Sequence, residues 1–299
     1  MNSHEKNHVK HTEIVTGLMF ILPATIFMVC VNFYPLLRGI LLAFTDTNFL
    51  YPDKAKFVGV SNFIEILMKD TEFWGVIGFT FFFAITSVVV VYITGLGLAL
   101  LLNREFKGKN FFRAFFLLPW IVPSVVAANS WLWMLNDQTG FINRTLMDWG
   151  LIKEPILFLA TGEMARLSAV FVNSWKNFPF MLLVLLAAMQ NIPSDLYESA
   201  KIDGANAFQC FKHITIPMIK QVSVVTTVLM MIWSFNNFEN VYLLTKGGPA
   251  RSTMNISIYT YNKAFYRNEW GYASAVAVIM MVMMFVLSSV YRHLLKESE

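Results

Sequence analysis

The segment ESAKIDGANAFQCFKHITIP, residues 198–217, is the part of the chain from which the fold is best inferred. It is polar, and it separates two apolar runs, Leu167–Met189 before it and Met218–Asn237 after it. A helix crosses the hydrocarbon core of a bilayer with about 20 residues, so each run is long enough to do so. We therefore expect the segment to be a short connection that joins two membrane spans on one side of the bilayer.

The composition supports a membrane protein. Hydrophobic residues make up 56% of the chain and charged residues only 14%, whereas soluble domains carry about 25% charge. The apolar runs are continuous and do not alternate with period two, so helices fit better than barrel strands. The fold class predicted is all-α: a polytopic membrane protein with six transmembrane helices. They lie near Ile14–Tyr34, Val76–Leu102, Phe111–Leu135, Leu167–Met189, Met218–Asn237 and Tyr272–Leu294.

The orientation in the membrane is inferred from basic residues. The first run is too long for a signal-peptide core and has no Ala-x-Ala-like cleavage site, so we expect a retained helix. Arg104, Lys107 and Lys109 lie beside the end of the second run, which favours a cytoplasmic position for that loop. We therefore expect a multi-pass protein of the bacterial inner membrane with both termini cytoplasmic. The net charge of +4 suits this bias and indicates no nucleic-acid partner.

The loop over residues 190–217 has its own helix signals. Ser194 is positioned to cap a helix whose first turn contains acidic residues, which are favourable near the positive end of a helix. Gly204 can adopt the left-handed conformation that ends such a helix. A second short helix is expected over Ala205–His213, and Pro217 suits the first turn of the next span. The loop is therefore predicted to form a compact two-helix knob.

The spacing of this loop resembles the "EAA" loop of permease subunits in binding-protein-dependent ABC importers. That pattern is E-A-A, three residues, G, nine residues, then I-x-L-P, and this chain departs from it at Ser199 and Ile216. The resemblance implies a type I ABC importer transmembrane domain whose knob docks in a groove of an ATPase subunit. It assigns coupling to Glu198, Ser199, Ala200, Gly204, Ile214 and Pro217. In that role the Glu198 carboxylate would meet a basic group, the next two residues would allow close approach, and the glycine would permit the turn.

The chain lacks the motif that holds nucleotide phosphates. No G-x-x-x-x-G-K-[ST] occurs, since Gly108-Lys109-Asn110 has neither the preceding glycine nor the hydroxyl. We expect no catalytic residue, no metal site and no cofactor on this chain, with ATP and Mg²⁺ bound by separate ATPase subunits. The partners implied by the resemblance are a second permease subunit, two cytoplasmic ABC ATPases and an extracytoplasmic solute-binding protein.

A second signature narrows the cargo. Thr245-Lys246-Gly247-Gly248-Pro249 is similar to the T-x-G-G-P element of carbohydrate permeases of the maltose and glycerol-phosphate type. The resemblance is most specific from Val76 to the end of the chain. It implies residues 1–75 as a cytoplasmic tail, first helix and first outer loop, and residues 76–294 as the importer domain with its coupling loop. The function expected is the membrane pathway of an ATP-driven carbohydrate importer.

The fourth run contains a charge where a membrane protein rarely tolerates one. Lys176 lies about nine residues from the outer end, roughly 13 Å deep at 1.5 Å per residue. A lysine there costs about 2.5–3.5 kcal/mol on insertion scales, so it should face a wet cavity or a partner, unless it snorkels to the outer surface. Pro179 is expected to weaken the helix beside it, as in broken helices that line a cavity. A cationic Lys176 would also suit an anionic cargo.

Sugars are recognised by aromatic faces, amides and carboxylates, and such residues cluster near Lys176 and after the fifth run. The predicted substrate-pathway residues are Trp175, Lys176, Asn177, Phe180, Asn236, Asn237, Glu239 and Asn240. Each asparagine could instead make an interhelical hydrogen bond, worth about 0.6 kcal/mol on average in membranes. Trp120 and Trp233 are interpreted as residues of the membrane–water interface, which the indole ring prefers.

An ion-coupled secondary transporter of a small polar solute is the alternative, with Lys176 and Glu239 as coupling charges. It predicts inverted internal repeats, which the chain does not show, and uptake that survives ATP depletion. A membrane-embedded enzyme would need an intramembrane His-His-Asp or Ser-Lys set, and none occurs. Neither alternative accounts for the loop at residues 198–217.

Overall fold

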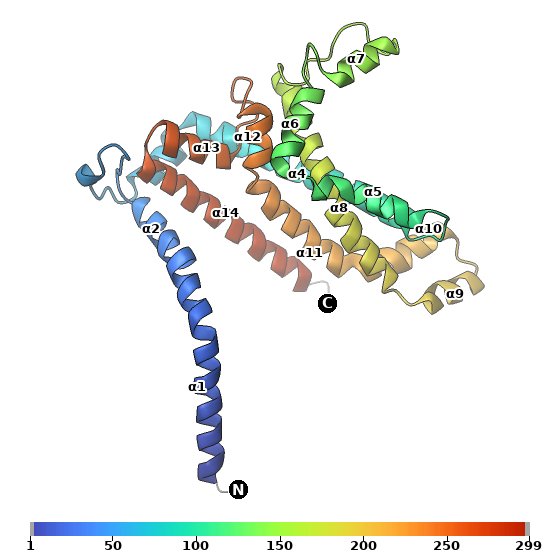
Figure 1. Ribbon diagram of the computed structural model, residues 1–299, viewed down its shortest axis with the longest axis horizontal. Helices are drawn as coiled ribbons and strands as arrows, with labels where there is room; N and C mark the ends of the chain where they lie inside the picture. The colour runs from blue at the N-terminus through green and yellow to red at the C-terminus, as the bar shows by residue number, and fades with distance from the viewer. Residues whose placement is uncertain (1–2, 297–299) are drawn as a thin grey trace. The chain divides into compact units, whose positions relative to one another are not determined.

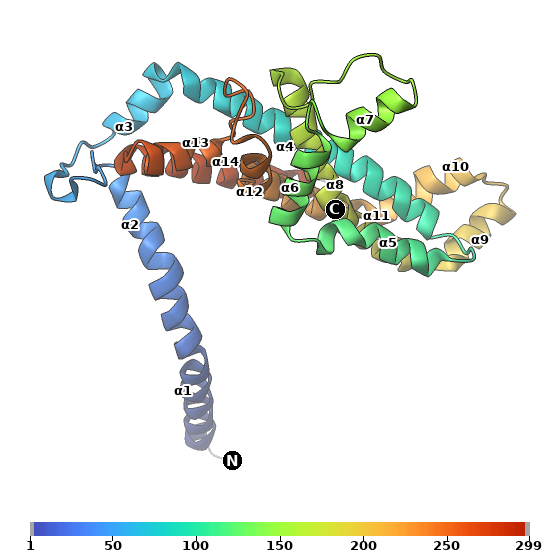
Figure 2. The ribbon, with the colours of Figure 1, turned by 45° about the horizontal axis from the view of Figure 1, so that its top comes forward.

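The computed structural model describes residues 3–296 and the side chains of residues 16–289. Within these limits the chain is helical and contains no β-strand; two isolated bridges join Thr45 to Phe57 and Asn48 to Glu269. The all-helical prediction is confirmed. The chain divides into two compact units, Met1–Lys69 with Asn262–Ile279 and Asp70–Tyr261 with Met280–Glu299. Figure 1 labels the helices except α3, which is labelled in Figure 2.

The first unit begins with a long apolar helix. This helix comprises α1 (Ser3–Met28), a π-helical turn (Val29–Phe33) and α2 (Tyr34–Leu42). A 3₁₀ turn (Pro52–Lys54), the short α3 (Ser61–Ile64) and two further π turns (Glu65–Lys69 and Asn262–Tyr266) complete it with the start of α14 (Trp270–Lys296), which ends in the second unit. The turn before α14 packs tightly, since a Cβ on Gly271 would lie 1.9 Å from the Thr45 carbonyl oxygen.

The second unit contains the remaining helices. They are α4 (Thr71–Leu102), α5 (Lys109–Ile121), α6 (Ser124–Met134), α7 (Phe141–Asp148), α8 (Gly162–Gln190), α9 (Ser194–Ile202), α10 (Ala207–Cys210), α11 (Ile216–Phe235), α12 (Glu239–Thr245) and α13 (Ile256–Tyr261). α9 and α10 lie at the end of the unit where α5 begins (Figure 2).

The core of the second unit is the packing of α4 on α8. Val91, Ala99, Leu182 and Leu185 are buried between them, together with Ile219 of α11. Gly95 lets the two helices approach, because a Cβ there would lie 2.7 Å from Cγ of Met181. This pair of helices is the fixed frame on which the shorter elements pack.

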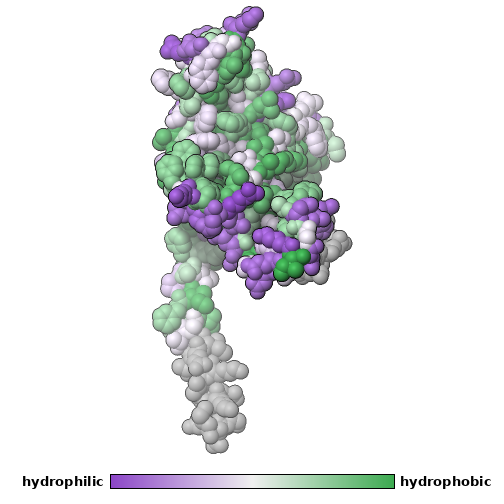
Figure 3. Space-filling view, turned by 90° about the vertical axis from the view of Figure 1, so that its right-hand side faces the viewer, coloured by the Kyte–Doolittle hydropathy of each residue, from purple (hydrophilic) through white to green (hydrophobic). Residues whose placement is uncertain are grey.

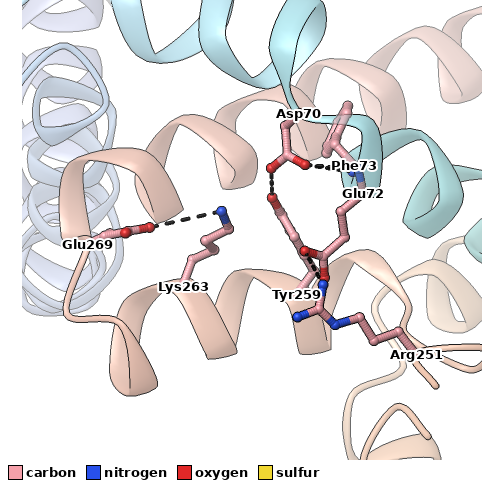
Figure 4. A network of polar contacts seen from close by, with 7 residues as sticks. All are labelled: Asp70, Glu72, Phe73, Arg251, Tyr259, Lys263 and Glu269. Carbon is pink, nitrogen blue, oxygen red and sulfur yellow. Dashed lines mark hydrogen bonds and ion pairs between the residues drawn. The ribbon is translucent and has the colours of Figure 1, made fainter. Parts of the chain in front are cut away.

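Polar contacts hold the start of α4. The Asp70 carboxylate caps the helix by accepting hydrogen bonds from the backbone N–H groups of Glu72 (2.9 Å) and Phe73 (3.2 Å). The Tyr259 hydroxyl donates to its other oxygen, and Arg251 pairs with Glu72 at 2.6 Å. Figure 4 shows this network, along with the Lys263–Glu269 pair of the first unit at 3.9 Å.

The number of candidate spans agrees with the prediction, but one of them has a different form. Five helices are long and apolar enough to cross a membrane: Thr16–Leu42, Thr71–Leu102, Gly162–Gln190, Ala207–Phe235 and Trp270–Ser289. The expected single helix Phe111–Leu135 is wrong. α5 and α6 meet there at 93°, because Val122 takes the extended conformation (φ −60°, ψ 129°) favoured before Pro123. The expected irregularity at Pro179 is also wrong, since α8 is continuous through it.

Prolines near two helix starts are accommodated by π turns. The first apolar helix runs past the expected end at Tyr34 to Leu42, and the Tyr34 N–H bonds the Val29 carbonyl just before Pro35. The Ile216 N–H bonds the Phe211 carbonyl in the same way before Pro217. Widening the turn relieves the clash between a proline ring and the preceding turn. Each apolar helix therefore continues through its proline.

Candidate functional site

A polar cavity of about 530 Å³ opens in the second unit. Three parts of the unit form its wall: the break between α5 and α6, one face of α8, and the turn between α11 and α12. Its lining residues are Trp120, Ser124, Lys176, Asn177, Trp233, Asn236, Asn237, Phe238, Glu239 and Asn240. The cavity combines aromatic rings, amides, a hydroxyl and two charges, which is the chemistry expected for a polyhydroxylated ligand.

The structure brings most of the predicted pathway residues to this cavity. Lys176, Asn177, Asn236, Asn237, Glu239 and Asn240 line it, and Trp175 and Phe180 do not. Trp175 packs edge-on against Trp131 of α6, with ring centroids 5.3 Å apart. The sequence interpretation missed Trp120, Ser124, Trp233 and Phe238 as lining residues.

Trp120 and Trp233, which the sequence interpretation placed at the membrane–water interface, line the cavity. Both pack on Phe180, with ring centroids 5.8 Å and 5.0 Å away. Phe180 therefore supports the two indoles from behind. A signal for Trp233 was present in the sequence, because it precedes Asn237 by one helical turn and so shares its face.

Lys176 is buried, with 8% of its surface exposed, and its ammonium is bound by backbone. It donates hydrogen bonds to the carbonyl oxygens of Pro119 at 3.1 Å and Trp120 at 3.3 Å, and to that of Val122. The last carbonyls of a helix lack intrahelical partners and carry partial negative charge. The Pro119 carbonyl could not find a helical partner in any case, because the residue four positions on is Pro123, which has no N–H. Lys176 thus satisfies the broken end of α5.

A chain of asparagines joins the cavity to the rest of the unit. Asn177 and Asn237 both donate to the Asn173 side-chain oxygen, at 3.0 Å and 2.8 Å. Asn255 donates to the Asn237 carbonyl, and its own oxygen accepts from the Ile258 N–H at 3.0 Å. The network fixes the α11–α12 turn against α8. The open choice for these asparagines is therefore partly resolved: Asn177 and Asn237 make structural hydrogen bonds and also line the cavity.

Glu239 begins α12 and is exposed at the cavity. In the part of the chain that the structure describes, its carboxylate forms no ion pair within contact distance and accepts no side-chain hydrogen bond, but its charge interacts with that of Lys176. The Asn237 side-chain oxygen also has no hydrogen-bond partner among the described residues, but it is enclosed by protein. The Glu239 carboxylate is therefore the exposed acceptor that the cavity wall offers to a hydroxyl group of a ligand.

The polar loop 190–217 folds as the predicted knob, with shifted boundaries. α9 ends at Ile202, and Gly204 takes the left-handed conformation at φ +84°. The expected Ser194 cap is wrong, because Pro193 holds the N-cap position and no side chain caps the helix. The expected helix Ala205–His213 is shorter, since Asn206 and Gln209 form a reciprocal capping box and hydrogen bonding turns π-helical at Phe211.

The knob presents charge beside bare apolar side chains. Glu198, Ser199 and Gly204 are exposed, Ala200 and Ile214 half-buried, and Pro217 exposed at the start of α11. Ile202 is 86% exposed and Phe208 70% exposed. The sequence interpretation did not single out these two, although both lie within the quoted segment. Figure 3, which views this end of the unit, shows hydrophilic side chains gathered below a largely hydrophobic surface.

Comparison with known proteins identifies the family of the chain. A protein-family model described as "Binding-protein-dependent transport system inner membrane component" matches residues 92–297. The trehalose/maltose transport system permease protein MalF of Thermococcus litoralis is 35% identical, over 97% of each chain. The lactose transport system permease protein LacF of Rhizobium radiobacter is 32% identical, over 96% of each chain.

A solved structure matches over nearly the whole length. It belongs to a bacterial ABC transporter involved in the import of the acidic polysaccharide alginate, with 25% identity, a TM-score of 0.84 and 99% of each chain covered. A second structure shows the alginate transporter in complex with an alginate pentasaccharide-bound periplasmic protein, with a TM-score of 0.82 and 25% identity over 96% of this chain and 95% of that one.

Apolar helices around a polar cavity, in a chain that matches this family, define a membrane-spanning transport subunit. The chain belongs to the family of inner-membrane components of binding-protein-dependent transport systems. It is a permease subunit of an ABC importer in a multi-pass inner-membrane setting, and ATP hydrolysis lies on separate subunits. The ion-coupled alternative is not favoured.

Proposed function

We propose that this permease carries carbohydrate through the cavity of the second unit, driven by ATPases that dock on the knob of residues 190–217. The observation that supports it most strongly is the pairing of that knob with a cavity walled by two tryptophans and several amides. Relatives named for trehalose, maltose and lactose transport support the same cargo class.

The proposed assembly contains a second permease subunit, two cytoplasmic ATPases and an extracytoplasmic solute-binding protein, in a bilayer with both chain termini cytoplasmic. ATP and Mg²⁺ are bound by the ATPases. ATP binding closes the ATPases and draws the knobs together, and the permeases then open the cavity toward the binding protein. A coupled change of this kind requires the two states to differ in their contacts with the ATPase.

In this mechanism the exposed Glu198 carboxylate accepts a charge-assisted hydrogen bond from a basic group of the ATPase. Ile202 and Phe208, which are exposed on the same knob, fill an apolar groove of the ATPase beside that basic group. Gly204 permits the turn between α9 and α10. Ser199, Ala200, Ile214 and Pro217 shape the surface and its junction with α11.

Transport in proteoliposomes tests the proposal. The complex with its binding protein should accumulate radiolabelled sugar with ATP inside, and should continue when the proton and sodium gradients are collapsed. Glu198→Lys should abolish both uptake and stimulation of ATP hydrolysis while the subunit stays in the membrane. Asp148→Lys, a matched reversal at the exposed end of α7, should transport normally. Uptake that needs an ion gradient but no ATP would exclude the mechanism.

A further inference from the structure

The two charged residues of the cavity, Lys176 and Glu239, differ in their hydrogen bonding. An ammonium group has three N–H donors and no acceptor. Lys176 directs its nitrogen at the carbonyl oxygens of Pro119, Trp120 and Val122. Its hydrogen-bonding capacity is therefore used within the chain, and no N–H remains for a carboxylate or phosphate on a ligand.

The position of these three carbonyls, at the end of α5, explains why they bind the ammonium group of Lys176. α5 ends where the backbone turns by 93° into α6, and the freed carbonyls lie beside the cavity wall formed by Trp120 and Ser124. In membrane transporters, unwound carbonyls and the C-terminal ends of half-helices coordinate mobile cations. Here the cation is covalently tethered to α8, so it can fix the break without an exchangeable ion.

The groups that remain free in the cavity favour hydroxyls. The Glu239 carboxylate accepts hydrogen bonds only, and within the described residues it has no hydrogen-bond or ion-pair partner, although its charge interacts with that of Lys176. Asn236 and Asn240 line the same space and bring amide groups to it. A hydroxyl satisfies such acceptors by donating. The charge of Lys176 is already offset by that of Glu239, and its N–H groups are taken by backbone carbonyls. An anionic ligand would therefore add an excess negative charge beside Glu239 and would find no N–H donor on Lys176, and like charges repel strongly at low dielectric.

We propose that Lys176 is a tethered cation that positions the α5–α6 break, and that the cavity therefore takes uncharged, hydroxyl-rich cargo and excludes anionic cargo. This inference rests on the proposed carbohydrate transport and narrows its substrate class. Lys176 is a positioning residue, and Glu239 sets the charge selectivity. The chain would then differ in cargo charge from the matched importer of an acidic polysaccharide.

Calorimetric titration of the assembled complex in nanodiscs, without nucleotide or binding protein, tests the inference. Maltotriose and trigalacturonate are suitable probes because they have equal numbers of rings and differ in charge. Wild-type complex should bind maltotriose about tenfold more tightly or better, a difference that corresponds to one unit of log affinity. Glu239→Gln should strengthen trigalacturonate binding about tenfold and leave maltotriose within about threefold.

Variants of Lys176 separate positioning from direct contact. Lys176→Met should weaken both trisaccharides by the same factor, because it loosens the wall that both would touch. If it weakened trigalacturonate alone, Lys176 would be an anion ligand and the inference would be overturned. Lys176→Arg keeps the cation and should keep the wild-type ratio of affinities, which tests the inference even if the methionine variant fails to assemble. Lys153→Met, in an exposed loop, should match wild type.

Two failures are distinguishable. Binding of both trisaccharides with trigalacturonate preferred would overturn the charge selectivity alone. Binding of neither, together with no ATP-driven uptake of any sugar in proteoliposomes, would remove the carbohydrate assignment and this narrower inference with it.

Discussion

The hydroxyls of Tyr197 and Thr215 lie 3.0 Å apart and share a hydrogen bond. Tyr197 belongs to α9, and Thr215 ends the π turn that leads into α11. Tyr197 is half-buried against the core and Thr215 is buried. The contact therefore ties the first helix of the knob directly to the span that carries Trp233 and leads to the cavity.

Removing this bond should loosen the knob without unfolding the subunit. A hydrogen bond of this kind contributes about 1 kcal/mol, a factor of about five in the population of the docked arrangement. We expect Tyr197→Phe to lower sugar transported per ATP hydrolysed by about that factor. Thr215→Val also removes the hydrogen bond from Thr215 to the Cys210 carbonyl oxygen at 3.5 Å, so it should lower the ratio at least as much, and the double variant should be no worse than Thr215→Val alone.

The matched control is Tyr34→Phe on the first apolar helix, where the same hydroxyl is removed from an exposed position. It should leave the coupling ratio unchanged. Additive losses in the double variant would show that the two hydroxyls act separately, and the tie between α9 and α11 would have no role in coupling.

Gly204 provides a test based on backbone conformation. Its φ of +84° is unfavourable for residues with a β-branched side chain, yet a Cβ there meets no atom within 4 Å. The strain is therefore conformational and not steric crowding. Gly204→Val should reduce uptake to about a tenth or less, whereas Gly204→Asn should keep most of it because asparagine tolerates this region. Equal losses in both variants would point to a contact of the glycine with the ATPase and not to its conformation.

The cap of α4 should be a stability element that is separate from transport. Tyr259 donates to the Asp70 carboxylate, which also holds two backbone N–H groups of α4. Hydrogen bonds to charged groups contribute about 1.5–3 kcal/mol, so Tyr259→Phe should lower the midpoint of thermal unfolding by several degrees. The measurement is the thermal unfolding of the purified complex in detergent. Tyr51→Phe, which removes an exposed hydroxyl in the first unit, should leave this midpoint unchanged. A shift of the same size in Tyr51→Phe would show that the contact with the Asp70 carboxylate is not the cause of the lower stability of Tyr259→Phe.

Much of the fold could be predicted because it depends on local properties. The length of an apolar run is sufficient to predict a span, and Gly204 and Pro217 mark the knob through their own backbone preferences. It was also predictable that several asparagines and Lys176 lie together, since intramembrane polar residues must face a cavity or one another. These inferences needed no knowledge of which helices touch.

The features that could not be predicted depend on contacts between residues far apart in the sequence. Pro119, Pro123 and Pro179 look alike along the chain, yet only the α5–α6 region is broken. Whether a break is tolerated depends on what satisfies the freed carbonyls, and here that group is Lys176, which lies 57 residues from Pro119. Trp120 lies at the end of α5, directly before the break, so its place at the cavity depends on the turn that follows it. Ile202 and Phe208 lacked a signal because exposure is a property of the folded knob.

The two prolines of the neighbouring spans should respond in opposite ways. Pro123→Ala supplies an N–H that can bond the Pro119 carbonyl, so a straight helix becomes possible and competes with Lys176 for the same oxygen. Uptake should fall by about tenfold or more while the subunit stays inserted and assembled, because the 93° turn shapes the wall at Trp120 and Ser124. Pro179→Ala lies in a helix that is already continuous, so uptake should change by less than about threefold and thermal stability should rise slightly. Uptake by each variant in proteoliposomes, with size-exclusion profiles to confirm assembly, checks both. If the alanine at position 123 were harmless and that at position 179 disabling, the flexible point of the pathway would lie in α8 and the tethered-cation account of the break would have no functional consequence.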